Sequence, residues 1–87
     1  MSIRVDLTYD MSKALGVRSL DLESAQTVKD VVEQTQARFA DKGEQFAKLA
    51  HVTAIAVNGI LTNYRKGMKT KLSDGDRVGF VKAASGG

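Results

Sequence analysis

The chain has 87 residues, of which 43% are hydrophobic and 26% are charged, and its formal net charge at pH 7 is +3. A chain of this length supports one core rather than two, and its composition is far from that of disordered chains. It contains no cysteine, which excludes disulfides, thiolate-bound zinc or iron–sulfur clusters, and a thiol nucleophile. Neither a signal peptide nor a segment of roughly 20 apolar residues that could span a membrane is present. We therefore expect a single-domain cytoplasmic protein that does not associate with membranes.

The N-terminal region predicts two strands that pair as a hairpin. Apolar and polar residues alternate over residues 3–9, which is the period of a strand with one buried face. Residues 10–16 are expected to form a loop. Residues 17–22 alternate again, with Leu20 and Leu22 on one face, and predict the second strand.

A change of period predicts a helix from Val28 to about Ala40. The residues that share one face of this helix are Val28, Val31, Val32, Thr35 and Phe39. Thr27 is placed to cap the first turn through its hydroxyl, and the carboxylate of Asp30 lies near the positive end of the helix dipole. Gly43 is expected to end the helix. Residues 46–50 predict a short second helical turn that covers the open end of the core.

The second half of the chain predicts three strands. Residues 53–57 are β-branched or small and apolar, and Asn58-Gly59 is the dipeptide that best tolerates the positive φ angles of a tight hairpin leading to residues 60–61. A turn over residues 73–76 then leads into the last strand. The predicted fold is α+β, in the order ββαβββ, with one main helix packed across a mixed sheet.

No strand or helix signal follows Lys82. We expect a domain over residues 1–82 and a flexible tail over residues 83–87 that ends in Gly86-Gly87.

The element order and three short motifs resemble the sulfur-carrier branch of the ubiquitin-like β-grasp family. The motifs are the hairpin Val57-Asn58-Gly59, the approach to the last strand over residues 72–78, and the terminal Ser85-Gly86-Gly87. Within that branch the chain is most similar to the small subunit of molybdopterin synthase, with the thiamine-biosynthesis sulfur carrier as a relative. A Gly-Gly pair directly at the C-terminus is the most specific part of this resemblance.

The resemblance implies that the C-terminal carboxylate of Gly87 is the working group. A partner adenylyltransferase that resembles ubiquitin-activating enzymes would adenylate it with ATP and magnesium, and a persulfide donor enzyme would convert it to a thiocarboxylate for molybdopterin synthesis. Gly86 and Ser85 would thread the tail into the partner, and an apolar sheet patch that includes Phe80 would dock it. The carrier itself would be non-catalytic, would hold no stable cofactor or metal, and would pair with a large synthase subunit.

Other functions are compatible with the same sequence. A ubiquitin-like modifier, or a carrier for tRNA thiolation or thiamine, would use the same activated C-terminus. An RNA-binding β-grasp module is less well supported, because the basic residues Arg65, Lys66, Lys69 and Lys71 have only Tyr64 as an interleaved aromatic. A solvated loop or a docking surface for an acidic partner is the better explanation of these charges.

Asp74, Asp76 and His51 are predicted to be structural. A turn explains both carboxylates, and two carboxylates without further ligands seldom hold a metal. His51 has no Cys, Ser or second His at a recognisable spacing, so we expect it to be packed or capping rather than catalytic.

Overall fold

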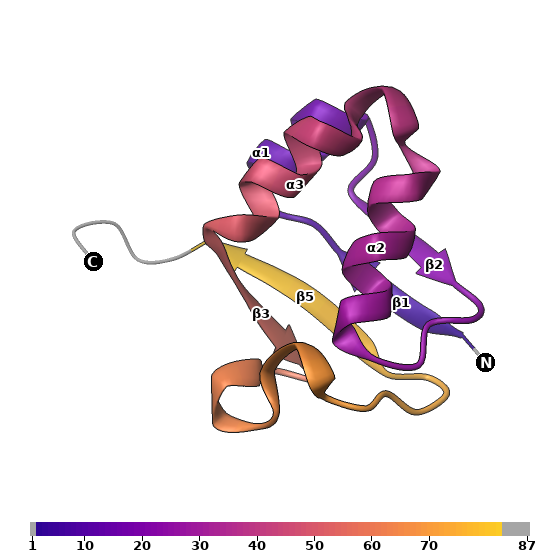
Figure 1. Cartoon of the computed structure of the whole chain (residues 1–87), viewed down its shortest axis with the longest axis vertical. Coiled ribbons are helices and arrows are strands. Elements are labelled where there is room, and N and C mark those ends of the chain that lie inside the picture. The colour runs from indigo at the N-terminus through magenta and orange to yellow at the C-terminus, as the bar shows by residue number, and fades with distance from the viewer. Residues whose placement is uncertain (1, 83–87) are drawn as a thin grey trace.

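The computed structural model describes residues 2–82, which form a five-stranded mixed sheet with helices packed against one face (Figure 1). The strands are β1 (Ile3–Asp6), β2 (Ser19–Leu22), β3 (Thr53–Val57), β4 (Ile60–Leu61) and β5 (Arg77–Lys82). The helices are α1 (Tyr9–Leu15), α2 (Val28–Arg38) and α3 (Gly43–His51), with 3-10 turns η1 (Ala40–Lys42), η2 (Thr62–Tyr64) and η3 (Gly67–Lys69). The predicted α+β class and the order ββαβββ of the five strands and the main helix are confirmed.

The last strand lies in the middle of the sheet. The strands are arranged in the order β2-β1-β5-β3-β4. β5 is parallel to β1, with Val5 opposite Val78, and antiparallel to β3, with Ile55 opposite Phe80. Within the sheet of the described residues, the antiparallel pairs β1–β2 and β3–β4 are therefore joined through β5.

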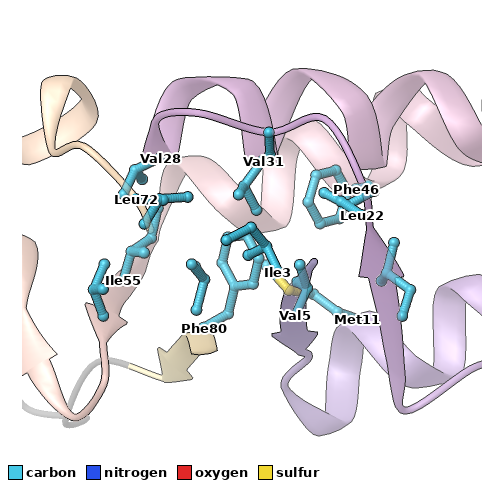
Figure 2. Packing of buried hydrophobic residues seen from close by; sticks show 14 of the residues in the cluster. Ile3, Val5, Met11, Leu22, Val28, Val31, Phe46, Ile55, Leu72 and Phe80 are labelled. Atoms are coloured by element: carbon cyan, nitrogen blue, oxygen red, sulfur yellow. The ribbon is translucent and has the colours of Figure 1, made fainter. Parts of the chain in front are cut away.

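The core lies between the inner face of the sheet and the helices (Figure 2). Ile3 and Val5 of β1, together with Val31 of α2, are fully buried. At the centre, the rings of Phe46 from α3 and Phe80 from β5 meet edge to face, with centroids 5.6 Å apart and an interplanar angle of 85°. Aromatic pairs in this geometry contribute beyond the apolar area that they bury.

The start of α2 is capped as predicted. The Thr27 hydroxyl accepts a hydrogen bond from the backbone N–H of Asp30 at 3.2 Å, and the Asp30 carboxylate accepts one from the N–H of Thr27 at 3.2 Å. This reciprocal arrangement is a capping box, which satisfies two backbone donors at the helix start. It fixes where α2 enters the core.

The expected loop over residues 10–16 was wrong, because this stretch is the helix α1. β1 ends at Asp6, and the hydroxyl of Thr8 accepts a hydrogen bond from the N–H of Met11 at 3.1 Å, which caps α1. Tyr9, expected at the end of the first strand, is 74% exposed on the helix. Gly16 ends α1 at φ 79°, a conformation that glycine adopts without strain.

The expected role of Gly43 was also wrong. α2 ends at Arg38, and Gly43 is the first residue of α3 with ordinary helical angles. A Cβ atom at this position would lie 2.9 Å from the backbone oxygen of Gln36 on α2. Glycine is therefore required by the close approach of two helices rather than by a helix stop.

Candidate functional site

The candidate site begins at the C-terminal end of β5. Pairing of β5 with β3 continues to Lys82, which lies opposite Thr53. The predicted tail residues Ser85, Gly86 and Gly87 lie outside the described residues, so their roles stay predictions. The structure fixes the point and the strand from which the tail starts.

The prediction that Phe80 belongs to an exposed sheet patch was wrong. Its ring is only 6% exposed and packs against Phe46 in the core. Phe80 alternates along β5 with Gly79 and Val81, so these two neighbours, and not Phe80, point to the outer face.

An apolar patch does exist on the outer face of the sheet, built from smaller residues. We call it the outer patch, and it consists of Ala54 of β3 with Val81, which lies opposite it, and Gly79 of β5. Ala56, which lies opposite Gly79, is only 7% exposed and adds little surface to the patch. Val81 is 45% exposed. A Cβ atom placed on Gly79 would meet no atom within 4 Å. The outer patch is therefore low and open, as a flat docking surface requires.

Charged residues border the outer patch on the side of β1. The guanidinium of Arg77 lies 3.0 Å from the Asp6 carboxylate, and that of Arg4 lies 3.4 Å from the same carboxylate. All three side chains are more than a third exposed, so these ion pairs contribute little to stability. They provide polar contacts beside an apolar centre, which is how protein interfaces are usually organised.

Asp74 and Asp76 have structural roles, as predicted. The Asp74 carboxylate accepts a hydrogen bond from the N–H of Ser2 at 2.7 Å. Asp76 accepts hydrogen bonds from the N–H of Ser73 at 2.7 Å and from the side-chain amide of Asn58 at 3.0 Å. The pKa of Asp76 is lowered below its ordinary value. The largest cause is the hydrogen bond from Ser73, the next is the hydrogen bond from Asn58, and the positive charge of Arg65 adds a smaller contribution. Asp76 therefore connects the last turn to the β3–β4 hairpin.

That hairpin has the predicted turn. Asn58 and Gly59 have φ angles of 51° and 86°, which is the combination that a two-residue hairpin loop requires. The side-chain oxygen of Asn58 also accepts a hydrogen bond from the N–H of Arg77 at 3.0 Å.

The remaining candidates are not part of the outer patch. His51, expected to be packed or capping, is exposed and therefore not packed, and it is the last residue of α3. Arg65, Lys66, Lys69 and Lys71 are all exposed, and none forms an ion pair within residues 2–82. In the same part of the chain, no group of three or more His, Cys, Asp or Glu side chains could hold a metal ion. No helix there is long and apolar enough to cross a membrane.

The sequence matches the ThiS family over residues 10–87. The chain belongs to this family of ubiquitin-like sulfur carriers. No curated protein matches it.

Several solved structures have the same fold. The small archaeal modifier protein 1 from Methanosarcina acetivorans is 22% identical, with a TM-score of 0.77 over 99% of this chain and 96% of that chain. A chain of the BexX/CysO complex from Amycolatopsis orientalis is 19% identical, with a TM-score of 0.77 over 98% of this chain and 99% of that one. A chain of the complex of subunits 1 and 2 of the molybdopterin-converting factor from Helicobacter pylori is 23% identical, with a TM-score of 0.65 over the full length of both chains. These similarities confirm the predicted β-grasp fold.

Proposed function

We propose that this ThiS-family protein carries sulfur as a thiocarboxylate on Gly87 and delivers it for molybdopterin synthesis. The observation that carries the proposal is the family match over residues 10–87, which includes the Gly86-Gly87 end. The structure supports it by starting the tail from β5, the strand that also carries half of the outer patch. The molybdopterin assignment is supported by the similarity to the Helicobacter pylori complex.

The chemistry requires activation by a partner, because a carboxylate is a poor acyl donor. The Gly87 carboxylate would attack the α-phosphorus of magnesium-bound ATP and release pyrophosphate. The terminal sulfur of a persulfide would then attack the acyl carbon and release AMP, and a second thiol would cleave the resulting sulfur–sulfur bond to leave the thiocarboxylate. ATP, magnesium and both thiols belong to partner enzymes, so this chain needs only to present the acyl group.

The tail suits this task by its length and its residues. Five residues follow Lys82, and at about 3.3 Å per extended residue they span about 16 Å. Two terminal glycines have no side chains to obstruct a narrow pocket, and holding the acyl carbon in place there favours reaction. The domain would stay outside while Gly87 reaches the partner's active site.

The outer patch is the proposed docking surface for the adenylyltransferase and for a large synthase subunit. It is apolar at Ala54 and Val81 and is bordered by the Arg77–Asp6 ion pair. Two of the similar structures are complexes with a second protein, which supports assembly through this fold.

Intact-mass spectrometry tests the sulfur transfer directly. After incubation with ATP, magnesium, the adenylyltransferase of the same organism and a persulfide donor, the protein is expected to gain the mass difference of one oxygen-to-sulfur exchange, located at Gly87 by fragmentation. Omission of ATP should prevent the gain. An unchanged mass in the complete reaction, with the adenylyltransferase shown to be active on another carrier, would contradict the proposal.

A second candidate is a protein modifier, which the similarity to the archaeal modifier protein favours. In that case Gly87 would form an isopeptide bond with lysines of other proteins. Immunoblots of a cell lysate would then show a ladder of conjugates that disappears when Gly87 is deleted. Carriers for thiamine or tRNA thiolation would instead show the thiocarboxylate without conjugates, and the accepting enzyme would distinguish them.

Gly79→Arg is expected to weaken binding to the adenylyltransferase roughly tenfold or more, because it places a large charged side chain at the centre of the outer patch. The fold should tolerate it, since a Cβ at Gly79 meets nothing within 4 Å. Calorimetry measures the affinity and thermal unfolding measures the stability. Ala37→Arg, which adds the same charge at an exposed position on α2, is the matched control. Equal affinity of the two variants would rule out the outer patch as the docking surface.

A further inference from the structure

A groove of about 560 Å³ lies along the edge of β3 and borders the outer patch at Ala54, which lines both. It is enclosed by the end of α3, the edge of β3 and the segment that contains η2 and η3. Its lining is mainly apolar and includes Val32, Ala50, Ile55, Leu61 and Met68. Among the described residues that line it, none is acidic and none is Phe, Tyr or Trp, and the imidazole of His51 is the one ring.

The edge of β3 that faces this groove is partly open. β4 pairs only with Ala56 and Val57, so no strand of the described chain lies beside Thr53 and Ile55 on that side. The direction of their backbone groups follows from Asn58, whose N–H donates to the carbonyl of Arg77 on β5 at 2.8 Å. Backbone groups of an antiparallel strand alternate in direction, so those of Ile55, an odd number of residues from Asn58, point away from β5.

The charge of this region is one-sided. From Gln45 to Ser73 the sequence contains five Lys and Arg residues and no Asp or Glu. The rest of the chain contains the other eight Lys and Arg residues and all ten acidic residues. Lys66 and Lys69 flank Gly67 and Met68, which line the groove. Neither lysine forms an ion pair within residues 2–82.

We propose that this groove binds an extended segment of a partner protein that carries acidic residues on both sides of an apolar centre. The segment would pair with the open edge at Ile55 and so extend the sheet by one strand. Its alternate apolar side chains would occupy the groove, and its carboxylates would meet Lys66 and Lys69. The inference does not rest on sulfur transfer, because it uses neither the tail nor Gly79 and Val81 of the outer patch.

The structure favours this occupant over two others. Single-stranded nucleic acid binds through bases stacked on aromatic rings. The groove has no Phe, Tyr or Trp and only the imidazole of His51, and Tyr64 lines a neighbouring hollow together with Arg65, Lys66 and Lys71. A second copy of the chain would bring two regions of the same positive charge together, which is unfavourable. An acidic segment is attracted instead.

The test uses the peptide Glu-Glu-Val-Thr-Val-Thr-Val-Glu-Glu, titrated into the isotope-labelled full chain and followed by NMR. We expect the largest amide shifts at Ile55 and Met68, together with slower hydrogen exchange of the Ile55 amide. The same peptide with Lys in place of Glu should bind much more weakly. The double variant Lys66→Glu, Lys69→Glu should weaken binding of the acidic peptide roughly tenfold, whereas Arg18→Glu, Lys42→Glu, an equal charge change at exposed positions away from the groove, should change it less than about twofold.

Four results would overturn the proposal. These are no binding of the acidic peptide, shifts confined to residues outside the groove, equal affinity for the Lys-flanked peptide, and shifts at Ile55 that depend only on the concentration of the protein itself. A twelve-nucleotide oligouridylate serves as the comparison probe. If it shifts the groove residues and the acidic peptide does not, the surface binds nucleic acid.

Discussion

Deleting Gly86 and Gly87 is expected to abolish sulfuration while leaving the melting temperature within about 2 °C of that of the full chain. The reason is that the core and the strand pairing described for residues 2–82 do not involve the two terminal glycines. The proposed chemistry, by contrast, needs the glycine carboxylate at the end of the tail. Intact-mass spectrometry after the complete reaction measures sulfuration, and circular dichroism measures the melting temperature.

Two control variants separate tail length from tail chemistry. Deleting Ala83 and Ala84 also removes two residues but keeps the terminal glycines, so it shortens the reach by about 7 Å and should reduce sulfuration without abolishing it. Adding one alanine after Gly87 keeps the reach but moves the carboxylate off the glycine, and should abolish sulfuration. Full sulfuration of the extended chain, or of the chain without Gly86 and Gly87, would refute the proposed role of Gly87.

Phe46→Ala is expected to produce the largest loss of stability of any single substitution in the core. Phe46 is the largest fully buried side chain, and it contacts Phe80 edge to face. Truncation of a buried Phe costs about 3–5 kcal/mol, and the whole folding free energy of a small domain is about 5–15 kcal/mol. The melting temperature should therefore fall by more than about 12 °C.

Urea unfolding of two further variants provides the comparison. Phe46→Leu keeps most of the apolar volume and should cost about half as much or less. Tyr64→Ala removes an aromatic ring that is 78% exposed and should change the free energy of unfolding by less than about 0.5 kcal/mol. A loss below about 1 kcal/mol for Phe46→Ala would mean that the helices do not pack on the sheet as described.

Much of the fold could be predicted because local signals and tertiary structure agree. The cap at Thr27, the hairpin at Asn58-Gly59 and the last strand are each specified by a few adjacent residues, and the structure confirms them. The sequence pattern did not predict α1, because the apolar alternation typical of a strand continues through Tyr9 into the first turn of the helix. Thr8 followed by the buried pair Met11 and Leu15, four residues apart, already has helical spacing.

The errors at Gly43 and Phe80 have a different cause. Gly43 looks like a helix stop in the sequence, and only the approach of α3 to the backbone of Gln36 shows why a side chain is excluded there. For Phe80, an apolar residue on a strand can lie on either face of the sheet, and only its packing against Phe46 of α3 shows that it belongs to the core. The groove could not be predicted, because its lining comes from α2, α3, β3, β4, η2 and η3, which only the tertiary fold brings together.

The parallel pairing of β1 with β5 also determines how the domain responds to mechanical force. Arg4 lies opposite Arg77 and Asp6 opposite Gly79, so the first and last strands run side by side in the same direction (Figure 1). When the start of β1 and the end of β5 are pulled apart, the two strands must slide past each other, and the evenly spaced hydrogen bonds between parallel strands are loaded together rather than one at a time. Forced unfolding is governed by the rate of barrier crossing rather than by equilibrium stability. An unfolding enzyme that pulls on the end of β5 while β1 is held would therefore have to shear these hydrogen bonds together, and we expect slow unfolding in this direction.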